Sequence, residues 1–372
     1  MQKLTMPVLI VDSAERNADL RHAFDFSTPD PIVGMIRGRE RWLVVPQMEF
    51  GRASRCADTK VVTPDMLKIP RRHRRRISGW ALGLLRAVGV RRVTVGADFP
   101  LGVARRLEAA GVRIRVATQP LFPARAVKTP AEIAKIRAVQ SAAVAAMQEA
   151  VRMIAASRAD ARGFLRTGRD YLTSERVRAC ITRALLDRQC MGREIIVAGG
   201  VQGADPHSKG EGPLRAHEAI VIDIFPKHMD HGYWGDITRT VIKGTSGARL
   251  RGMYQAVYAA QREALRRVRA GASLPSIHRA VIREFERRGY PTDLMDGKPC
   301  GFIHGTGHGV GLDIHESPSI GFAPGRLRRG NVITIEPGLY YPDLGGVRIE
   351  DTVVVTASGF KYLATCGKRF EA

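Results

Sequence analysis

The sequence predicts a mixed α/β (α+β) protein built from two domains, and three observations support this class. Its 372 residues are enough for two domains with cores of ordinary size. Strand and helix signals alternate as far as about residue 125, which is typical of an α/β domain. Beyond that point, two helices followed by strands occur twice, over 129–243 and 250–356, which hints at an internal duplication.

The first domain is expected over residues 1–125. Its strands are predicted at Val8–Val11, Arg41–Val45, Arg92–Val95 and Val112–Val116, and its helices at Ser13–Ala23, Ile77–Val88 and Pro100–Ala110. It contains no Gly-rich phosphate loop and no cluster of His, Cys or acidic residues at useful spacing. The chemistry is therefore expected in the second domain.

The second domain, expected over 128–372, opens with a long helix. Thr129 as N-cap, Pro130 at the first helical position and Glu132 form a capping box, and apolar residues follow at helical spacing. Further helices are predicted at Ser174–Arg188, Leu250–Val268 and Ser273–Arg288, and a strand at Ile195–Ala198.

Two carboxylates stand in a stretch that predicts a β-hairpin. Its flanks, Ala219–Phe225 and Tyr233–Lys243, are rich in residues that favour strands. A turn at His228–His231 would place Asp223 directly opposite Asp236. Like charges opposed in this way are destabilising, and a bound cation is the simplest compensation. The alternative is a solvated hairpin with two incidental acids.

Three histidines, His304, His308 and His315, lie in the glycine-rich segment 302–316. The first two are four residues apart, as on a zinc-protease helix, but the glycines between and after them would each cost a helix about 1 kcal/mol. The segment is therefore predicted to be a loop or irregular strand that passes close to a ligand or metal.

Two further carboxylates, Glu336 and Glu350, lie in or just after β-branched runs and are expected to be partly buried. Burying an ionised carboxylate without a partner is costly. Arg348 lies two residues before Glu350, on the same face of a strand, so an ion pair is the simpler interpretation of Glu350.

Four carboxylates and one imidazole form a candidate set of metal ligands: Asp223, Asp236, His308, Glu336 and Glu350. The four carboxylates would cancel the charge of two divalent cations, leaving a bridging hydroxide as the nucleophile. Such ligands suit Mn²⁺, which is favoured here, or Co²⁺, Zn²⁺ or Fe²⁺ better than copper. Two metals roughly 3.5–4 Å apart activate water and polarise a carbonyl, so hydrolysis of an amide is their natural use.

These motifs resemble the pita-bread metallopeptidases, which include Xaa-Pro aminopeptidase, prolidase and methionine aminopeptidase. The resemblance covers 128–372 and is carried by Asp236-Ile-Thr-Arg-Thr, His308-Gly-Val-Gly-Leu, Ile335-Glu-Pro-Gly-Leu and Val347-Arg-Ile-Glu-Asp. The first domain resembles the creatinase-type N-terminal domain in its α/β rhythm and its position. The resemblance implies such a domain followed by a duplicated pita-bread catalytic domain.

The resemblance also implies the role of each ligand. Asp223 and Glu350 would bind both metals, while Asp236 would bind one and His308 the other. Glu336 would be both a ligand and the general base.

On the substrate side, the resemblance implies catalytic and binding roles for three histidines and one arginine. His315 would bind substrate and assist the tetrahedral intermediate, and His207 would lie near the scissile bond. His304 and Arg348 match substrate-side residues of the Xaa-Pro branch.

The Xaa-Pro branch is the one that combines this N-terminal domain with intact metal ligands. The expected activity is hydrolysis of the bond before a proline at the second position, by an aminopeptidase P or a prolidase, and the resemblance implies a homodimer. Asp223 and Asp236 are thirteen residues apart, against eleven in the family. The resemblance therefore does not determine the pocket rim near this turn, nor the exact substrate. The alternatives are an amidohydrolase of a small non-peptide substrate and a non-catalytic protein- or nucleic-acid-binding member of the fold.

Composition and charge set the expectations for nucleic-acid binding, membrane spans and cellular compartment. The net charge of +23 includes the run Arg71–Arg76, which reads as a solvated helix face, so nucleic-acid binding is expected to be weak and electrostatic if present. No apolar run approaches the roughly 18 residues of a membrane helix. Five scattered cysteines without a Cys-x-x-Cys motif indicate reduced thiols in a cytoplasm.

Overall fold

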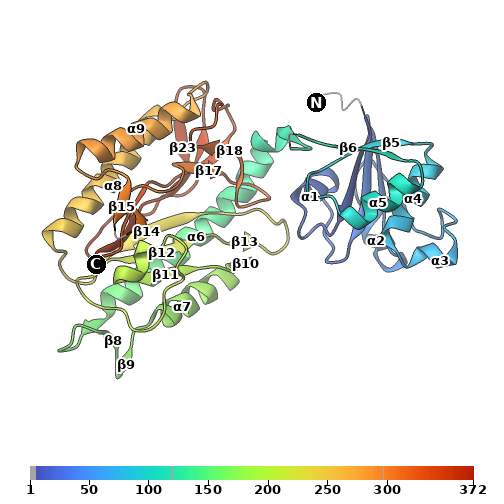
Figure 1. The fold of residues 1–372 in the computed structure, drawn as a ribbon. Helices are drawn as coiled ribbons and strands as arrows, with labels where there is room; N and C mark the ends of the chain where they lie inside the picture. The colour runs from blue at the N-terminus through green and yellow to red at the C-terminus, as the bar shows by residue number, and fades with distance from the viewer. Residues whose placement is uncertain (1–5, 119, 296) are drawn as a thin grey trace. The chain divides into compact units, whose positions relative to one another are not determined.

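The computed structural model describes residues 6–118, 120–295 and 297–372, and its mixed α/β character is the one predicted (Figure 1). The chain divides into two compact units, Met1–Arg125 and Ala126–Ala372. Within the described residues, no helix combines the length and the apolar character that a membrane span requires.

The first unit is built on a six-stranded sheet with the order β4-β3-β2-β1-β5-β6. Its strands are β1 (Val8–Asp12), β2 (Ile32–Arg37), β3 (Glu40–Val44), β4 (Thr59–Val62), β5 (Arg92–Val95) and β6 (Arg113–Val116). Its helices are α1 (Ala18–Phe24), α2 (Phe50–Ala53), α3 (Arg71–Arg74), α4 (Ile77–Ala87) and α5 (Leu101–Ala109). Separate apolar clusters pack against the two faces of the sheet.

Strands β2 and β4 were not predicted, and Gly34 interrupts the apolar run of β2. A Cβ at Gly34 would lie 2.5 Å from the ring of Phe24, so the glycine is what allows α1 to pack closely on the sheet. Helix α1 also begins later than predicted, where Asn17 accepts a hydrogen bond from the backbone N–H of Leu20.

The second unit contains two pairs of helices. They are α6 (Pro130–Ala156), α7 (Ser174–Leu186), α8 (Ala248–Arg267) and α9 (Leu274–Arg287). The predicted capping box at the start of α6 is confirmed, with Thr129 and Glu132 bonded reciprocally. The predicted face of α7 is buried through Val177, Ile181 and Leu185.

Two sheets, of three and five strands, hold eight of the 17 described strands of the second unit. The first, ordered β11-β12-β14, contains β11 (Ile196–Gly199), β12 (Ile220–Ile224) and β14 (Ile237–Val241). The second, ordered β18-β17-β19-β22-β23, contains β17 (Gly307–Gly309), β18 (Glu316–Ile320), β19 (Val332–Ile335), β22 (Asp351–Val355) and β23 (Phe360–Tyr362).

Shorter ladders complete the second unit. They pair β20 (Gly338–Tyr341) with β21 (Gly345–Arg348), β10 (Cys190–Met191) with β13 (Lys227–His228), β15 (Asp293–Met295) with β16 (Lys298–Cys300), and β8 (Leu165–Thr167) with both β7 (Arg158–Ala159) and β9 (Asp170–Tyr171).

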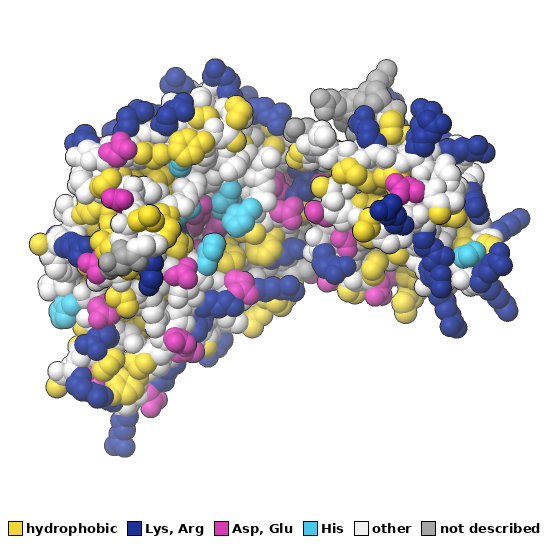
Figure 2. Space-filling view, in the orientation of Figure 1, with side chains coloured by type: hydrophobic (Ala, Val, Ile, Leu, Met, Phe, Trp, Pro, Cys, Tyr) yellow, Lys and Arg dark blue, Asp and Glu magenta, His cyan; other side chains and the backbone are white. Residues whose placement is uncertain are grey.

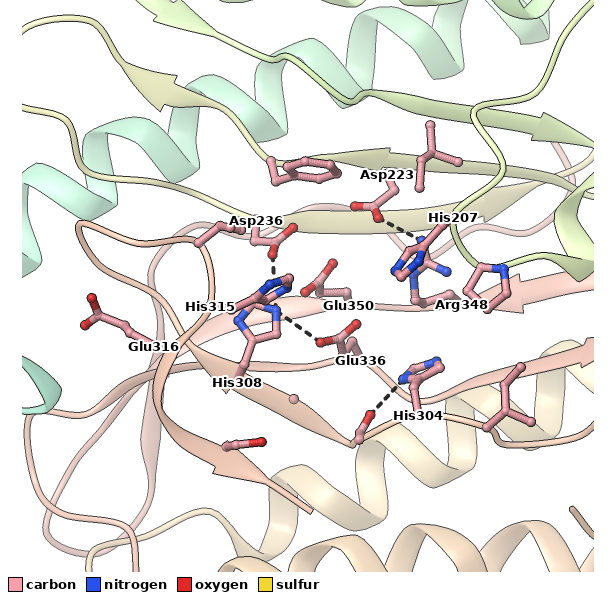
Figure 3. A pocket seen from close by; sticks show the side chains of 18 of the residues that line it. His207, Asp223, Asp236, His304, His308, His315, Glu316, Glu336, Arg348 and Glu350 are labelled. Atoms are coloured by element: carbon pink, nitrogen blue, oxygen red, sulfur yellow. Dashed lines mark hydrogen bonds and ion pairs between the residues drawn. The ribbon is translucent and has the colours of Figure 1, made fainter. Parts of the chain in front are cut away.

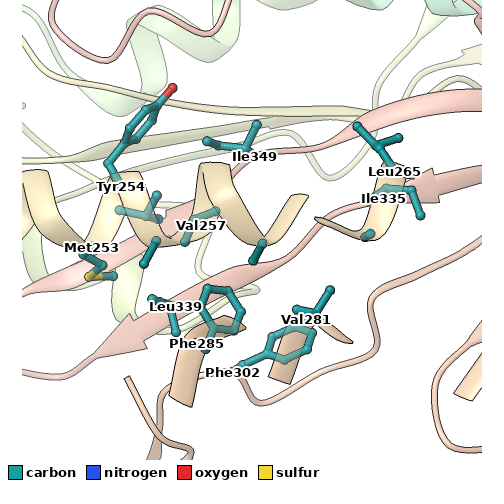
Figure 4. Close-up of a cluster of buried hydrophobic side chains, with 14 of the residues drawn as sticks. Met253, Tyr254, Val257, Leu265, Val281, Phe285, Phe302, Ile335, Leu339 and Ile349 are labelled. Carbon is teal, nitrogen blue, oxygen red and sulfur yellow. The ribbon is translucent and has the colours of Figure 1, made fainter. Parts of the chain in front are cut away.

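Each helix pair buries one face of its own strands. Helices α6 and α7 pack on the alternate residues Ile220, Ile222 and Ile224 of β12. Helices α8 and α9 pack in the same way on β19, β20 and the residues around β21, with Ile335 and Ile349 among the buried side chains (Figure 4). Because strand side chains alternate, the intervening polar residues emerge on the opposite faces.

The predicted register of the central hairpin was wrong by two residues. Asp223 lies opposite Thr238, not opposite Asp236. The loop is Met229–Gly232, closed by a hydrogen bond from the His228 N–H to the Tyr233 carbonyl, because Gly232 adopts the left-handed conformation (φ 73°). A shift of two preserves the face, so both aspartates still point to the same side.

Candidate metal centre

The structure brings all the residues singled out in the sequence to one cavity of about 710 Å³ in the second unit. Its lining includes the nine predicted site residues: His207, Asp223, Asp236, His304, His308, His315, Glu336, Arg348 and Glu350. On the face shown in Figure 2, histidine side chains gather at a hollow of this unit with acidic side chains beside them. Residues more than 140 positions apart in the chain thus share one site.

Backbone alternation and glycines together position the candidate ligands. Asp236 immediately precedes β14, and Glu336 immediately follows β19, each on the face turned away from the helices. His308 lies in β17 between two glycines, as the irregular-strand prediction required. A Cβ at Gly307 would lie 2.0 Å from the Thr334 carbonyl oxygen, and one at Gly309 2.5 Å from the Ser317 carbonyl oxygen. Only glycine therefore lets the strands approach and present His308.

The candidate ligands converge from both sheets (Figure 3). His308 Nε2 lies 3.2 Å from Glu336 Oε1 and 3.5 Å from Asp236 Oδ2. Ligand atoms of Asp236, His308 and Glu350 lie within 4.8 Å of one another. Thr238 Oγ1 donates to Glu350 Oε2 at 2.8 Å, which fixes that carboxylate.

The donor set fits divalent cations. Asp223 Oδ1 and Glu350 Oε1 are buried and have no hydrogen-bond partner among the described residues. Burial, and then the charge of neighbouring carboxylates, raises the pKa of both Asp236 and Glu350 well above the usual range. A cation would satisfy the orphaned oxygens and relieve this repulsion.

The pKa of Glu336 is shifted in the opposite direction, below its usual value. Burial acts to raise its pKa, but the hydrogen bond and charge of His308 outweigh burial and lower the pKa to about 2. Thr334 Oγ1 also donates to Glu336 Oε1 at 3.2 Å. The ionised form is therefore the one that these contacts hold.

The three remaining histidines border the ligand cluster. The His315 ring meets that of His308 edge-on, with ring centroids 4.3 Å apart. His304 Nε2 lies 2.9 Å from the Tyr340 hydroxyl. His207 is exposed at the rim, and its backbone N–H donates to Asp205 Oδ1. His207 and His315 can present a ring nitrogen to a molecule in the cavity. Both ring nitrogens of His304 are engaged, since its Nδ1 lies 2.8 Å from the Gly305 carbonyl oxygen and its Nε2 contacts Tyr340.

Arg348 does not pair with Glu350, contrary to the simpler interpretation of the sequence. Its Nη2 donates to Asp223 Oδ2 at 2.7 Å, its Nη1 to the Tyr340 hydroxyl at 2.8 Å and its Nε to Thr238 Oγ1 at 3.2 Å. The chain leaves β21 at Arg348 before β22 begins, so the assumption of one continuous strand fails.

Sequence reasoning missed Tyr340, which links two predicted site residues. Its hydroxyl lies between His304 and Arg348, and burial raises its pKa to about 12. It also missed Gln140 of α6, whose side-chain amide exchanges two 2.8 Å hydrogen bonds with the backbone of Asp236. The one signal in the sequence was that Tyr340 is the last residue of segment 331–340, which contains Glu336.

Comparison with known proteins places these motifs in a wider group. A family model described as metallopeptidase family M24 matches residues 134–357. The Xaa-Pro dipeptidase of Pyrococcus furiosus is 39% identical over 175 residues, which are 46% of this chain and 47% of that protein. Xaa-Pro aminopeptidase 1 of Streptomyces coelicolor is 29% identical over 325 residues, 81% of this chain and 63% of that protein. This chain thus spans about half of the first relative and under two thirds of the second.

Solved structures match the chain along nearly its whole length. An X-Pro aminopeptidase from Thermotoga maritima superposes with a TM-score of 0.81 at 24% identity, covering 98% of this chain and 97% of the other. The prolidase from Pyrococcus furiosus gives 0.80 at 25% identity, with 97% of each chain covered. The predicted fold, an N-terminal α/β domain followed by a pita-bread domain, is therefore confirmed.

Proposed function

The chain belongs to metallopeptidase family M24, and from this membership we propose that it is a two-metal Xaa-Pro peptidase that hydrolyses the bond before proline. The observation that carries the proposal is the convergence of five ligand-type side chains, two of which hold buried oxygens without a partner among the described residues. The names of the relatives, Xaa-Pro dipeptidase and Xaa-Pro aminopeptidase, support the bond before proline.

The five proposed ligands would hold two divalent cations, and Mn²⁺ is our proposal for their identity. The ligands are Asp223, Asp236, His308, Glu336 and Glu350. When bound, such a pair makes water nucleophilic at neutral pH and polarises the carbonyl of the scissile bond.

The chain's own residues supply the remaining steps. Glu336, held ionised by its contacts, accepts the proton of the attacking water on its carboxylate and passes it toward the leaving proline nitrogen. His315 donates a hydrogen bond to the oxygen on which charge develops, and His207 orients the peptide. His304, with both ring nitrogens engaged, presents its ring to the peptide. Tyr340 steadies His304 through the hydroxyl–Nε2 contact.

The oligomeric state and the cellular compartment follow from the resemblance and from the cysteines. We propose a homodimer, from the resemblance, and a cytoplasmic protein, since all five cysteines are free thiols. Lys and Arg side chains are spread over the face shown in Figure 2, as a general basic bias requires. Nucleic-acid binding would then be weak and steeply dependent on salt.

Product analysis by mass spectrometry tests the proposed function. Purified protein, with and without Mn²⁺, is given an Xaa-Pro dipeptide, an Xaa-Pro-Yaa tripeptide, a longer Xaa-Pro peptide and matched peptides without proline. Metal-dependent release of the first residue from the proline peptides alone is the expected result. Cleavage of none, with metal bound, would contradict a peptidase and favour a small-amide substrate.

His315→Ala is expected to lower kcat by roughly 100-fold, since one lost hydrogen bond to developing charge costs about 2.7–4 kcal/mol. Metal content, measured by elemental mass spectrometry, should be unchanged, because His315 contacts the cluster only through the ring of His308. His217→Ala removes a surface histidine bonded to the Thr245 carbonyl and serves as the matched control. Loss of metal in His315→Ala would instead make that residue a ligand.

A further inference from the structure

We infer that Lys128 is a positioning residue for the proposed reaction, because its buried ion pair with Glu316 fixes the loop that presents His315 to the cavity. The inference rests on the proposed function, in which His315 contacts the oxygen that develops charge. Glu316 belongs to the described lining of the cavity, and Lys128 lies behind it, outside that lining. Lys128 therefore acts through its neighbours and not on the peptide.

The ion pair between Lys128 and Glu316 joins two segments that are 188 residues apart. Lys128 Nζ donates to Glu316 Oε1 at 2.6 Å, and the two side chains are 1% and 8% exposed. A pair buried to this degree adds little net stability, because desolvation of the two charges offsets their attraction. Loss of one partner leaves the other charge buried and uncompensated. The pair therefore gives the Glu316 carboxylate one strongly preferred place.

The backbone places Lys128 independently of Glu316. The Lys128 N–H donates to the Gly330 carbonyl at 2.9 Å. Lys128 also immediately precedes Thr129, the N-cap of α6, where the helix dipole makes a positive charge unfavourable. A lysine at this position does not assist α6, and its charge is compensated by Glu316.

The Glu316 carboxylate closes the loop from Gly311 to Glu316 onto itself. The Asp313 N–H donates to Glu316 Oε2 at 3.4 Å, and the Gly311 N–H donates to the Asp313 carbonyl at 3.0 Å. A Cβ at Gly311 would lie 2.4 Å from Glu316 Oε1, so a larger residue there would displace the carboxylate. The loop thus takes its shape around the atom that Lys128 holds.

His315 directly precedes Glu316 and depends on this loop for its orientation. Within the part of the chain that the structure describes, its exposed side chain takes part in no hydrogen bond and meets the ring of His308 edge-on. In Figure 3, His315 lies at the ligand cluster while Glu316 points away from it. A displaced loop would therefore move the His315 ring, and a misplacement of about 1 Å can cost roughly 100-fold in rate.

A double-mutant cycle between Lys128 and His315 tests the inference. The values of kcat, KM and metal content are measured with an Xaa-Pro-Yaa tripeptide for Mn²⁺-loaded wild-type protein, Lys128→Met, His315→Ala and the variant that carries both substitutions. We expect Lys128→Met to lower kcat roughly tenfold or more, short of the loss in His315→Ala, with KM and metal content unchanged. In the His315→Ala background the same substitution should lower kcat no further, because the residue that it positions is gone.

Two further variants complete the design. Glu316→Gln keeps the shape of the buried side chain and removes the charge at the other end of the pair. It should show the same non-additivity with His315→Ala, so it replaces Lys128→Met if that variant does not fold. Lys60→Met removes a lysine from a pair with Glu40 in the first unit, whose side chains are 65% and 41% exposed, and should leave kcat unchanged.

Equal losses from Lys128→Met in the wild-type and His315→Ala backgrounds would overturn the inference and leave the proposed function standing. An unchanged kcat, or a loss of bound metal, would do the same. Failure of both Lys128→Met and Glu316→Gln to fold would also overturn the inference, by assigning the pair to the fold. Cleavage of no Xaa-Pro peptide by the metal-loaded wild-type protein would overturn the proposed function, and the inference with it.

Discussion

Asp236→Ala is expected to reduce metal-dependent turnover at least roughly 1,000-fold, or about 4 kcal/mol in activation free energy. The side chain lies 3.5 Å from His308 Nε2, and its ligand atom lies within 4.8 Å of those of His308 and Glu350. Its removal should also lower the amount of metal bound per chain. Turnover and metal content measured on the same preparation would show whether the two fall together.

The fold should survive this substitution, because the backbone of Asp236 does not depend on its side chain. The side chain of Gln140 accepts from the Asp236 N–H and donates to the Asp236 carbonyl oxygen. Thr352 Oγ1 donates to the same carbonyl oxygen at 2.8 Å. The control is Asp187→Ala, which removes an exposed aspartate of the same unit after α7. Wild-type turnover in Asp236→Ala would contradict the assignment of the metal site.

Metal removal is expected to destabilise the second unit, and protonation of Asp236 and Glu350 to offset part of the loss. Saturation at about 1,000 times Kd contributes about 4 kcal/mol per site, which corresponds to roughly 10 °C in Tm for a unit of this size. Chelation should remove that gain and leave the carboxylates facing one another without a cation. Thermal unfolding with and without Mn²⁺ measures the difference.

The direction of the pH effect follows from the pKa shifts. Asp236 and Glu350 have raised pKa values, so the folded chelated protein binds protons that the unfolded chain does not, and its stability rises as pH falls from neutral toward the ordinary carboxyl range. Glu336 acts oppositely below that range, since its stabilising contribution is lost as pH falls from 4.5 through about 2. These two carboxylates therefore favour a higher Tm at about pH 5.5 than at about pH 7.5. His278, His304 and His315 oppose them in this window, because burial lowers their pKa values. The carboxylate contribution is measured as the difference in pH response between wild-type protein and Asp236→Asn.

Asp236→Asn is the matched control for this pH effect. It keeps the shape of the side chain and removes one of the two groups with a raised pKa, so the gain in Tm on acidification should shrink. A change in Tm between pH 7.5 and 5.5 that is the same in chelated wild-type protein and in chelated Asp236→Asn would contradict the repulsion between these carboxylates.

Local signals in the sequence were enough for most of the second unit. The capping box at Thr129 and the apolar spacing of α7 are short-range patterns, and the helices formed where they predicted. The glycines around His308 excluded a helix for a steric reason that holds regardless of the surroundings. Strand alternation was sufficient to place both hairpin aspartates on one face.

The contacts that the sequence did not reveal depend on geometry between distant segments. The hairpin register was decided by Gly232, and a turn one residue earlier, which shifts the pairing by two, satisfies the same strand patterns. Arg348 reaches Asp223, 125 positions away, in preference to a neighbour two residues along its own chain. Tyr340 became a site residue only because β20 brings its hydroxyl between His304 and Arg348.

The most direct test of the two-metal centre is the number of metal ions bound per chain. Elemental mass spectrometry on protein loaded with Mn²⁺ and freed of excess metal should give two ions per wild-type chain and a clear loss in Asp236→Ala. Two ions in wild-type protein and fewer in the variant would support the five-ligand site. A wild-type chain that binds no Mn²⁺, Co²⁺, Zn²⁺ or Fe²⁺, or binds two ions undiminished in Asp236→Ala, would contradict it.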